Sequence, residues 1–212
     1  MTKRTNPNLK DLKELALRQK KKGDLDSAVI SLEQAIDVTW RELADLHGIL
    51  GGTRKLQGDF VAAIAEYDAG FRLDSQYNAL SSYNDLNRLV TRVLLCPGAL
   101  SDPNLLRKED GVEFVDLRLE LSRLEKELQR DLAGVRSNDY WAAGDLAIAA
   151  ALNGYLATAT KAVKQFVSYS SLPDNAYGSY IQTLSQLEQL DLPDKEIILS
   201  VKALFERKSP TG

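Results

Sequence analysis

Apolar residues recur three and four positions apart along most of this chain, which is the spacing of one face of an α-helix. The clearest case is residues 112–134, where one stripe holds six large apolar side chains (Phe114, Leu117, Leu121, Leu124, Leu128 and Leu132). Aromatic residues make up only 7% of the chain and there are only six prolines, which favours helix over strand. The pattern predicts an all-α protein.

The helical pattern also repeats. Residues 21–36, 56–71 and 152–167 align without gaps, and each stretch has a glycine, a large apolar residue two positions later and an alanine five positions later (Gly23, Leu25, Ala28; Gly58, Phe60, Ala63; Gly154, Leu156, Ala159). A glycine permits a tight reversal between two helices, and a small residue lets the two helices approach closely. We therefore expect helical hairpins in which the three alanines are buried. Asp24 and Asp59 suit the first position of the second helix.

This pattern resembles the tetratricopeptide repeat, a pair of antiparallel helices of about 34 residues. Trp40 stands where that family closes a repeat with proline. The resemblance implies a right-handed α-solenoid of about five antiparallel helix pairs. We place the pairs at residues 9–40, 41–74, 75–137, 138–172 and 173–208 of a single domain, after a flexible basic N-terminus at residues 1–8.

The arrangement after residue 75 shows a weaker resemblance. A helix with the sequence YNDLNRLVTRVLL, a long connection and then a repeat that begins with DYW are similar to the helical regulatory region of apoptosis-signal-regulating kinases. They are also similar to bacterial tetratricopeptide proteins built in the same way. This implies a regulatory module. The chain itself contains no kinase signature.

The net charge of −3 gives no reason to expect nucleic acid or a membrane surface as a partner. The charge is uneven, however, because residues 1–22 carry +6 and the remainder carries −9. The single cysteine excludes an intrachain disulfide, and no apolar run approaches the length of a membrane span. These features predict a cytoplasmic protein.

The stretch HGILGGTRKLQGDF, residues 47–60, resembles a phosphate-binding loop at first sight. Its glycines have the wrong spacing for one and follow no strand, so we expect them to serve close helix packing. His47 is expected to pack at the edge of an apolar stripe, and a pair with Cys96 for nucleophilic catalysis is a remote alternative. With one histidine and one cysteine, we expect no metal site and no cofactor.

The family resemblance implies that the first helix of each pair lines a concave groove. Carried over residue by residue, it assigns eleven residues to the groove (Lys13, Leu17, Lys20, Asp45, Ile49, Asn84, Asn87, Arg88, Trp141, Asp145 and Ile148). Asparagine and arginine suit recognition of the main chain and of carboxylates. The lysines on both sides of Leu17 suit a partner protein or peptide that is acidic.

The function expected from the sequence is a non-catalytic scaffold or adaptor that binds a partner protein or peptide in this groove. Two alternatives stay open. One is a self-associating structural or regulatory module, a homodimer that pairs through its groove or through residues 112–134. The other, a minor one, is a cryptic enzyme, since a fold alone does not exclude a grafted catalytic site.

Overall fold

The structure is a computed structural model that describes residues 9–108, 111–169, 172–173 and 175–207. Within these residues every regular element is a helix, which confirms the predicted all-α class. The predicted flexible N-terminus at residues 1–8 lies outside the described residues. The α-helices are α1 (Leu9–Lys21), α2 (Leu25–Leu56), α3 (Phe60–Gln76), α4 (Tyr83–Leu95), α5 (Leu117–Leu132), α6 (Tyr140–Leu152), α7 (Leu156–Ser168), α8 (Asn175–Glu188) and α9 (Lys195–Glu206), with two 3₁₀ helices, η1 (Pro97–Leu100) and η2 (Pro103–Lys108).

Three of the reversals between helices depend on glycine, as the repeat pattern predicted. Gly23, Gly58 and Gly154 have φ angles of 79°, 80° and 84°, a region that residues with a Cβ rarely adopt. The side chains of Asp24 and Asp59 each accept a hydrogen bond from a backbone N–H in the first turn of the following helix. These local signals fix where α2, α3 and α7 begin.

α2 is one continuous helix of 32 residues, although the sequence predicted a boundary between two helices at residues 40 and 41. The physical reason is visible in the sequence, because residues 25–47 contain no glycine or proline that would interrupt the helix. The Trp40 ring instead stacks on Tyr77, with the ring centroids 5.1 Å apart. The first two predicted pairs therefore share one long helix.

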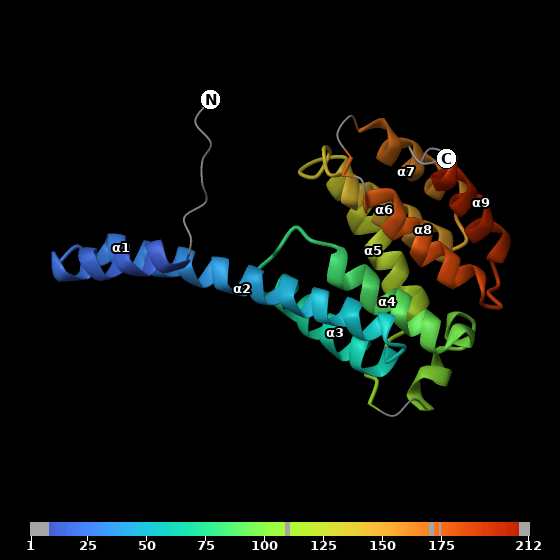
Figure 1. Cartoon of the computed structure of the whole chain (residues 1–212), viewed down its shortest axis with the longest axis horizontal. Helices are drawn as coiled ribbons and strands as arrows, with labels where there is room; N and C mark the ends of the chain where they lie inside the picture. Colours follow the sequence, from blue (N-terminus) through green and yellow to red (C-terminus); the bar gives the residue numbers. More distant parts are fainter. Residues whose placement is uncertain (1–8, 109–110, 170–171, 174, 208–212) are drawn as a thin grey trace.

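The molecule has a protruding end and a compact end (Figure 1). α1 packs along the first half of α2, and this hairpin extends away from the rest of the chain. The second half of α2 packs against α3, which in turn contacts α4. α4 to α9 gather at the other end, where α6 contacts α5, α7, α8 and α9.

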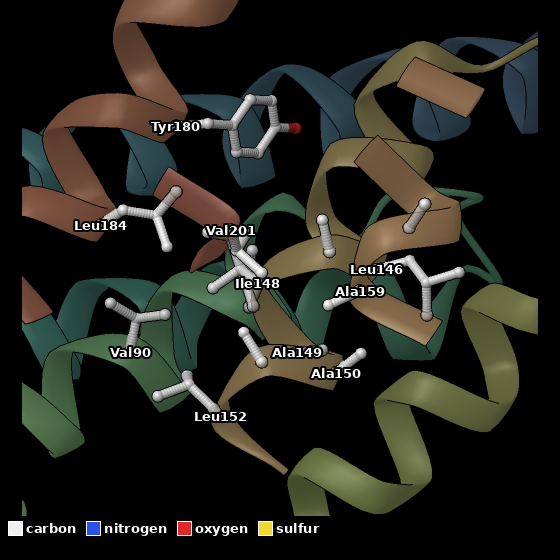
Figure 2. Packing of buried hydrophobic residues seen from close by; sticks show 14 of the residues in the cluster. Val90, Leu146, Ile148, Ala149, Ala150, Leu152, Ala159, Tyr180, Leu184 and Val201 are labelled. Carbon is white, nitrogen blue, oxygen red and sulfur yellow. The ribbon is translucent and has the colours of Figure 1, made fainter. Parts of the chain in front are cut away.

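The main hydrophobic core lies around α6, whose residues from Ala142 to Leu152 are all buried. Figure 2 shows Ile148 and Leu152 of α6 close to Val90 of α4, Leu184 of α8 and Val201 of α9. A helix that is apolar on all sides is stable only when other helices surround it. α6 is therefore the central helix of the compact end.

The predicted small-residue contacts are confirmed, since Ala28, Ala63 and Ala159 are all buried. The predicted helix at residues 112–134 begins later than expected, at Leu117, because Asp116 caps its first turn. Phe114 therefore precedes the helix and is exposed, with the Arg107 guanidinium 4.2 Å from its ring centroid.

A candidate partner-binding groove

A groove of about 720 Å³ lies between the second half of α2, the first half of α4, α6 and α8. Five large apolar residues that line it are between 37% and 69% exposed (Ile49, Leu56, Leu80, Tyr83 and Trp141). Buried Val90 and Ile148 also line the groove. Scattered exposed apolar residues are normal on a protein surface, whereas a concentration of them in a hollow is typical of a binding site.

Two basic residues line this groove, Lys55 and Arg136, and Arg136 pairs with Asp139 at 2.9 Å. The Nζ atom of Lys55 donates a hydrogen bond to Oδ1 of Asn87 at 3.2 Å, and Nδ2 of Asn87 donates to the Tyr83 carbonyl oxygen at 2.9 Å. Burial lowers the pKa of Lys55 to about 8. Among the described residues Lys55 forms no ion pair with a carboxylate, so an anionic group in the groove would find an uncompensated ammonium.

Asp145 connects three of the helices that form the groove. Its carboxylate accepts hydrogen bonds from the Ser82 hydroxyl at 2.6 Å and from the Tyr180 hydroxyl at 2.9 Å. A guanidinium N–H of Arg136 donates to the same Ser82 oxygen. Burial raises the pKa of Asp145 to about 6. The carboxyl group thus holds the start of α4 and the first half of α8 against α6.

The structure brings together five of the eleven residues that the sequence assigned to the groove: Ile49, Asn87, Trp141, Asp145 and Ile148. Asp45 is exposed on α2 but does not line the groove. Lys13, Leu17 and Lys20 are exposed on α1, in the protruding hairpin, and form a separate surface.

Asn84 was assigned to the groove and is instead buried against neighbouring helices. Its Nδ2 atom donates to Asp74 and to the Ala44 carbonyl oxygen. A Cβ atom at Gly70 would lie 2.5 Å from this amide, so the glycine provides the space that Asn84 fills. Asn84 is therefore used in packing α4 against α2 and α3, and it is not available to a partner.

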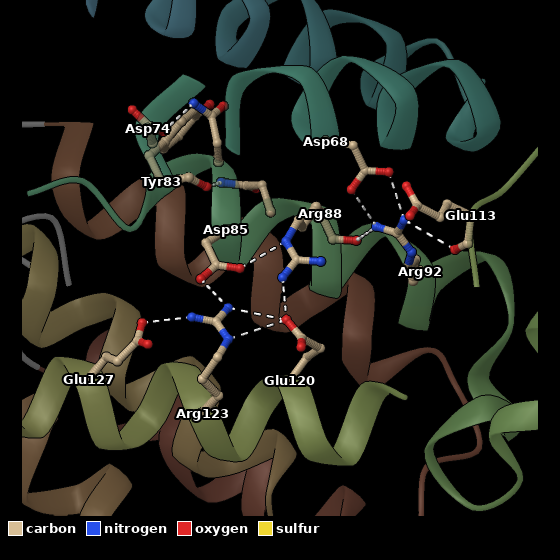
Figure 3. Close-up of polar contacts among 12 residues, drawn as sticks. Asp68, Asp74, Tyr83, Asp85, Arg88, Arg92, Glu113, Glu120, Arg123 and Glu127 are labelled. Carbon is tan, nitrogen blue, oxygen red and sulfur yellow. Dashed lines mark hydrogen bonds and ion pairs between the residues drawn. The ribbon is translucent and has the colours of Figure 1, made fainter. Parts of the chain in front are cut away.

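Arg88 is the second assignment that was wrong, and Figure 3 shows why. Its guanidinium pairs with Asp85 and with Glu120 of α5, and it lies 4.0 Å from the ring centroid of Phe71. Although burial opposes it, the hydrogen bond from Arg88 and the charge of Arg123 lower the pKa of Glu120 below its usual range. These charges are compensated inside the protein.

The same view contains a second buried ion pair, between Arg92 and Asp68 at 2.7 Å (Figure 3). Arg92 also donates to the Glu113 carbonyl oxygen. α4 packs against both α3 and α5, and the Arg88 and Arg92 side chains are buried there. A sequence pattern that assigns one inward face to each first helix cannot foresee this double burial.

Sequence reasoning missed the contribution of α8. Ser179, Gln182, Thr183 and Gln186 line the groove with the spacing of one helix face. The Oε1 atom of Gln186 is buried and has no hydrogen-bond partner within the described residues. This polar stripe was visible in the sequence, but nothing local indicated that it would face α2 and α4.

The glycine-rich stretch serves packing, as expected. A Cβ atom at Gly48 would lie 2.8 Å from the Tyr83 ring, and one at Gly51 would lie 3.0 Å from the Tyr67 ring. His47 is half-buried, and its Nδ1 atom lies 2.7 Å from Oε2 of Glu66. Cys96 ends α4, where it packs against the main core.

Within the described residues no cluster of histidine, cysteine or acidic side chains could hold a metal ion. None of the helices there combines the length and the apolar character needed to cross a membrane. Comparison with protein-family models, with curated proteins and with solved structures finds no match for this chain.

Proposed function

We propose that this chain is a non-catalytic interaction module that binds a segment of a partner protein in the groove between α2, α4, α6 and α8. The observation that supports this most is the set of exposed apolar side chains that line the groove. The glycine turns and the buried alanines support a tetratricopeptide-like solenoid as the scaffold.

The lining indicates the chemistry of the bound segment. Large apolar side chains of the partner would pack on Ile49, Leu56 and Trp141, which together offer an aliphatic and an aromatic surface. A carboxylate of the partner would pair with Lys55, and main-chain groups would bond to Asn87 and to the amides of α8. The preferred partner is therefore an acidic segment with apolar anchors.

The proposal can be tested with peptides selected from a random display library against the wild-type protein. Each peptide is measured by calorimetry against the wild type and against the double variant Ile49→Ala with Leu56→Ala. Both residues are exposed, so the variant should fold normally. We expect it to bind the selected peptides about tenfold more weakly or worse, because it removes two anchor contacts.

Leu119→Ala is the matched control, since Leu119 is an exposed leucine on α5 that does not line the groove. It should leave the affinity unchanged. Peptides that bind the double variant as tightly as the wild type would show that the groove is not the binding site.

A further inference from the structure

The protruding hairpin has an apolar stripe that nothing in the described chain covers. Leu25, Val29, Leu32 and Ile36 lie four, three and four positions apart on α2, and each is between 48% and 60% exposed. This is the spacing of the apolar seam by which helices pair in coiled coils. The stripe belongs to the hairpin and does not line the groove.

The face of α2 next to this stripe is already used. Ala28, Ser31 and Ala35 are buried on the side where α1 packs. Further along the helix α3 provides cover, as the stacking of Trp40 on Tyr77 shows. The stripe thus begins at the hairpin turn and stops where contact with α3 starts, so one uninterrupted apolar face about three turns long is left to solvent.

The two helices of the hairpin carry opposite charge. α1 has five basic and two acidic residues, a formal charge of +3. Residues 25–40 of α2 have three acidic residues (Asp26, Glu33 and Asp37) and no basic one, a formal charge of −3. In a two-fold dimer the same patch of both copies forms the interface, and its two halves exchange places. The basic half of one copy can therefore contact the acidic half of the other, and the reverse.

We propose that the hairpin of α1 and the first half of α2 is a self-association surface, and that its occupant is the same hairpin of a second copy of this chain. The two hairpins form a four-helix arrangement in which α1 of each copy lies over residues 25–40 of the other. The acidic partner expected for Lys13 and Lys20 is then the second copy.

The size of the hairpin agrees with a reversible dimer. Sixteen helical residues are about 24 Å long and two helices about 20 Å wide, so each face offers roughly 500 Å². Two such faces bury roughly 1,000 Å², which is near the lower limit for a specific interface. An anionic membrane would attract α1 but repel residues 25–40, so it fits the charges less well.

The test is sedimentation of the full chain over a concentration series. We expect the wild type to change from monomer to dimer as concentration rises, and Val29→Gln with Ile36→Gln to stay monomeric. Both positions are exposed and glutamine is a good helix former, so circular dichroism should be unchanged. Leu119→Gln is the matched control on α5 and should dimerise like the wild type.

A charge exchange tests the geometry. Lys13→Glu with Lys20→Glu, and separately Asp26→Lys with Glu33→Lys, should each weaken dimerisation, because like charges then face each other. An equal mixture of these two double variants should recover the dimer, since opposite charges face each other again. A fold defect within one chain would not be rescued by mixing.

Two results would overturn the proposal. One is a wild type that remains monomeric throughout the series, including a monomer that co-sediments with vesicles of anionic phospholipid. The other is a dimer that Val29→Gln with Ile36→Gln leaves intact. The groove is not altered in any of these variants, so peptide binding there would be unaffected by either result.

Discussion

At the residue scale, Asp145 links the groove to the stability of the fold. Its carboxyl group accepts hydrogen bonds from the hydroxyls of Ser82 and Tyr180. Burial raises its pKa to about 6, against an ordinary value of 3.8. Between these pH values the folded protein holds a proton at Asp145 that the unfolded chain has released. The stabilisation from this group is therefore complete below pH 3.8 and is lost as the pH rises through 6.

Asp145→Asn removes this titration, and we expect a pH-dependent effect from it. The free energy of unfolding of the variant relative to the wild type should increase between pH 4 and pH 7, by an amount on the order of 2 kcal/mol. Urea unfolding of both proteins at the two pH values measures it. If the free energies of unfolding of the variant and the wild type differ by the same amount at both pH values, Asp145 ionises normally in the folded protein.

At the element scale, the close approach of α2 and α3 depends on small residues, among them Ala63 and Gly51. Ala63→Leu should destabilise the protein by about 1–3 kcal/mol, because the added volume has no space at a fully buried position. Ala65→Leu is the control on the same helix, since Ala65 is exposed and should tolerate leucine. Equal melting temperatures for the two variants would contradict this packing.

The elements also show which signals are readable from sequence. The turns at Gly23 and Gly58 and the caps at Asp24 and Asp59 were predictable, because each depends on residues within one or two turns of helix. The continuity of α2 through residue 40 depends on a similar local rule, the absence of glycine and proline from residues 25–47. The family pattern predicted that a helix ends at Trp40, whereas the local rule predicted that the helix continues, and the helix continues.

The candidate site was predictable only in part, because some of its contacts join residues that are far apart in the sequence. Ile49 and Trp141 were assigned to a groove from the family resemblance, and they line one. Arg88 was assigned in the same way, but Glu120, 32 positions later, compensates its charge. Lys55 was missed because its position beside Asn87 results from how α2 packs against α4. Such pairings between distant segments leave no local pattern.

At the scale of the whole molecule, we propose two interaction surfaces, one for a partner protein and one for a second copy of this chain, and they lie at different places. The groove in the compact end combines apolar anchors with Lys55, whereas the hairpin combines an apolar stripe with two helices of opposite charge. A dimer joined at the hairpins would leave both grooves free. Two linked grooves bind a partner with two matching segments more tightly than one groove does.

The claim at the centre of this account is that the groove binds another protein, and photo-crosslinking in the native cell tests it most directly. A benzophenone amino acid replaces Thr53, which is exposed and lines the groove, or Leu119, which is exposed and lies outside it. We expect a discrete crosslink to a different polypeptide from position 53 and none from position 119. Crosslinks from both positions alike, from neither, or only between two copies of this chain would contradict the claim.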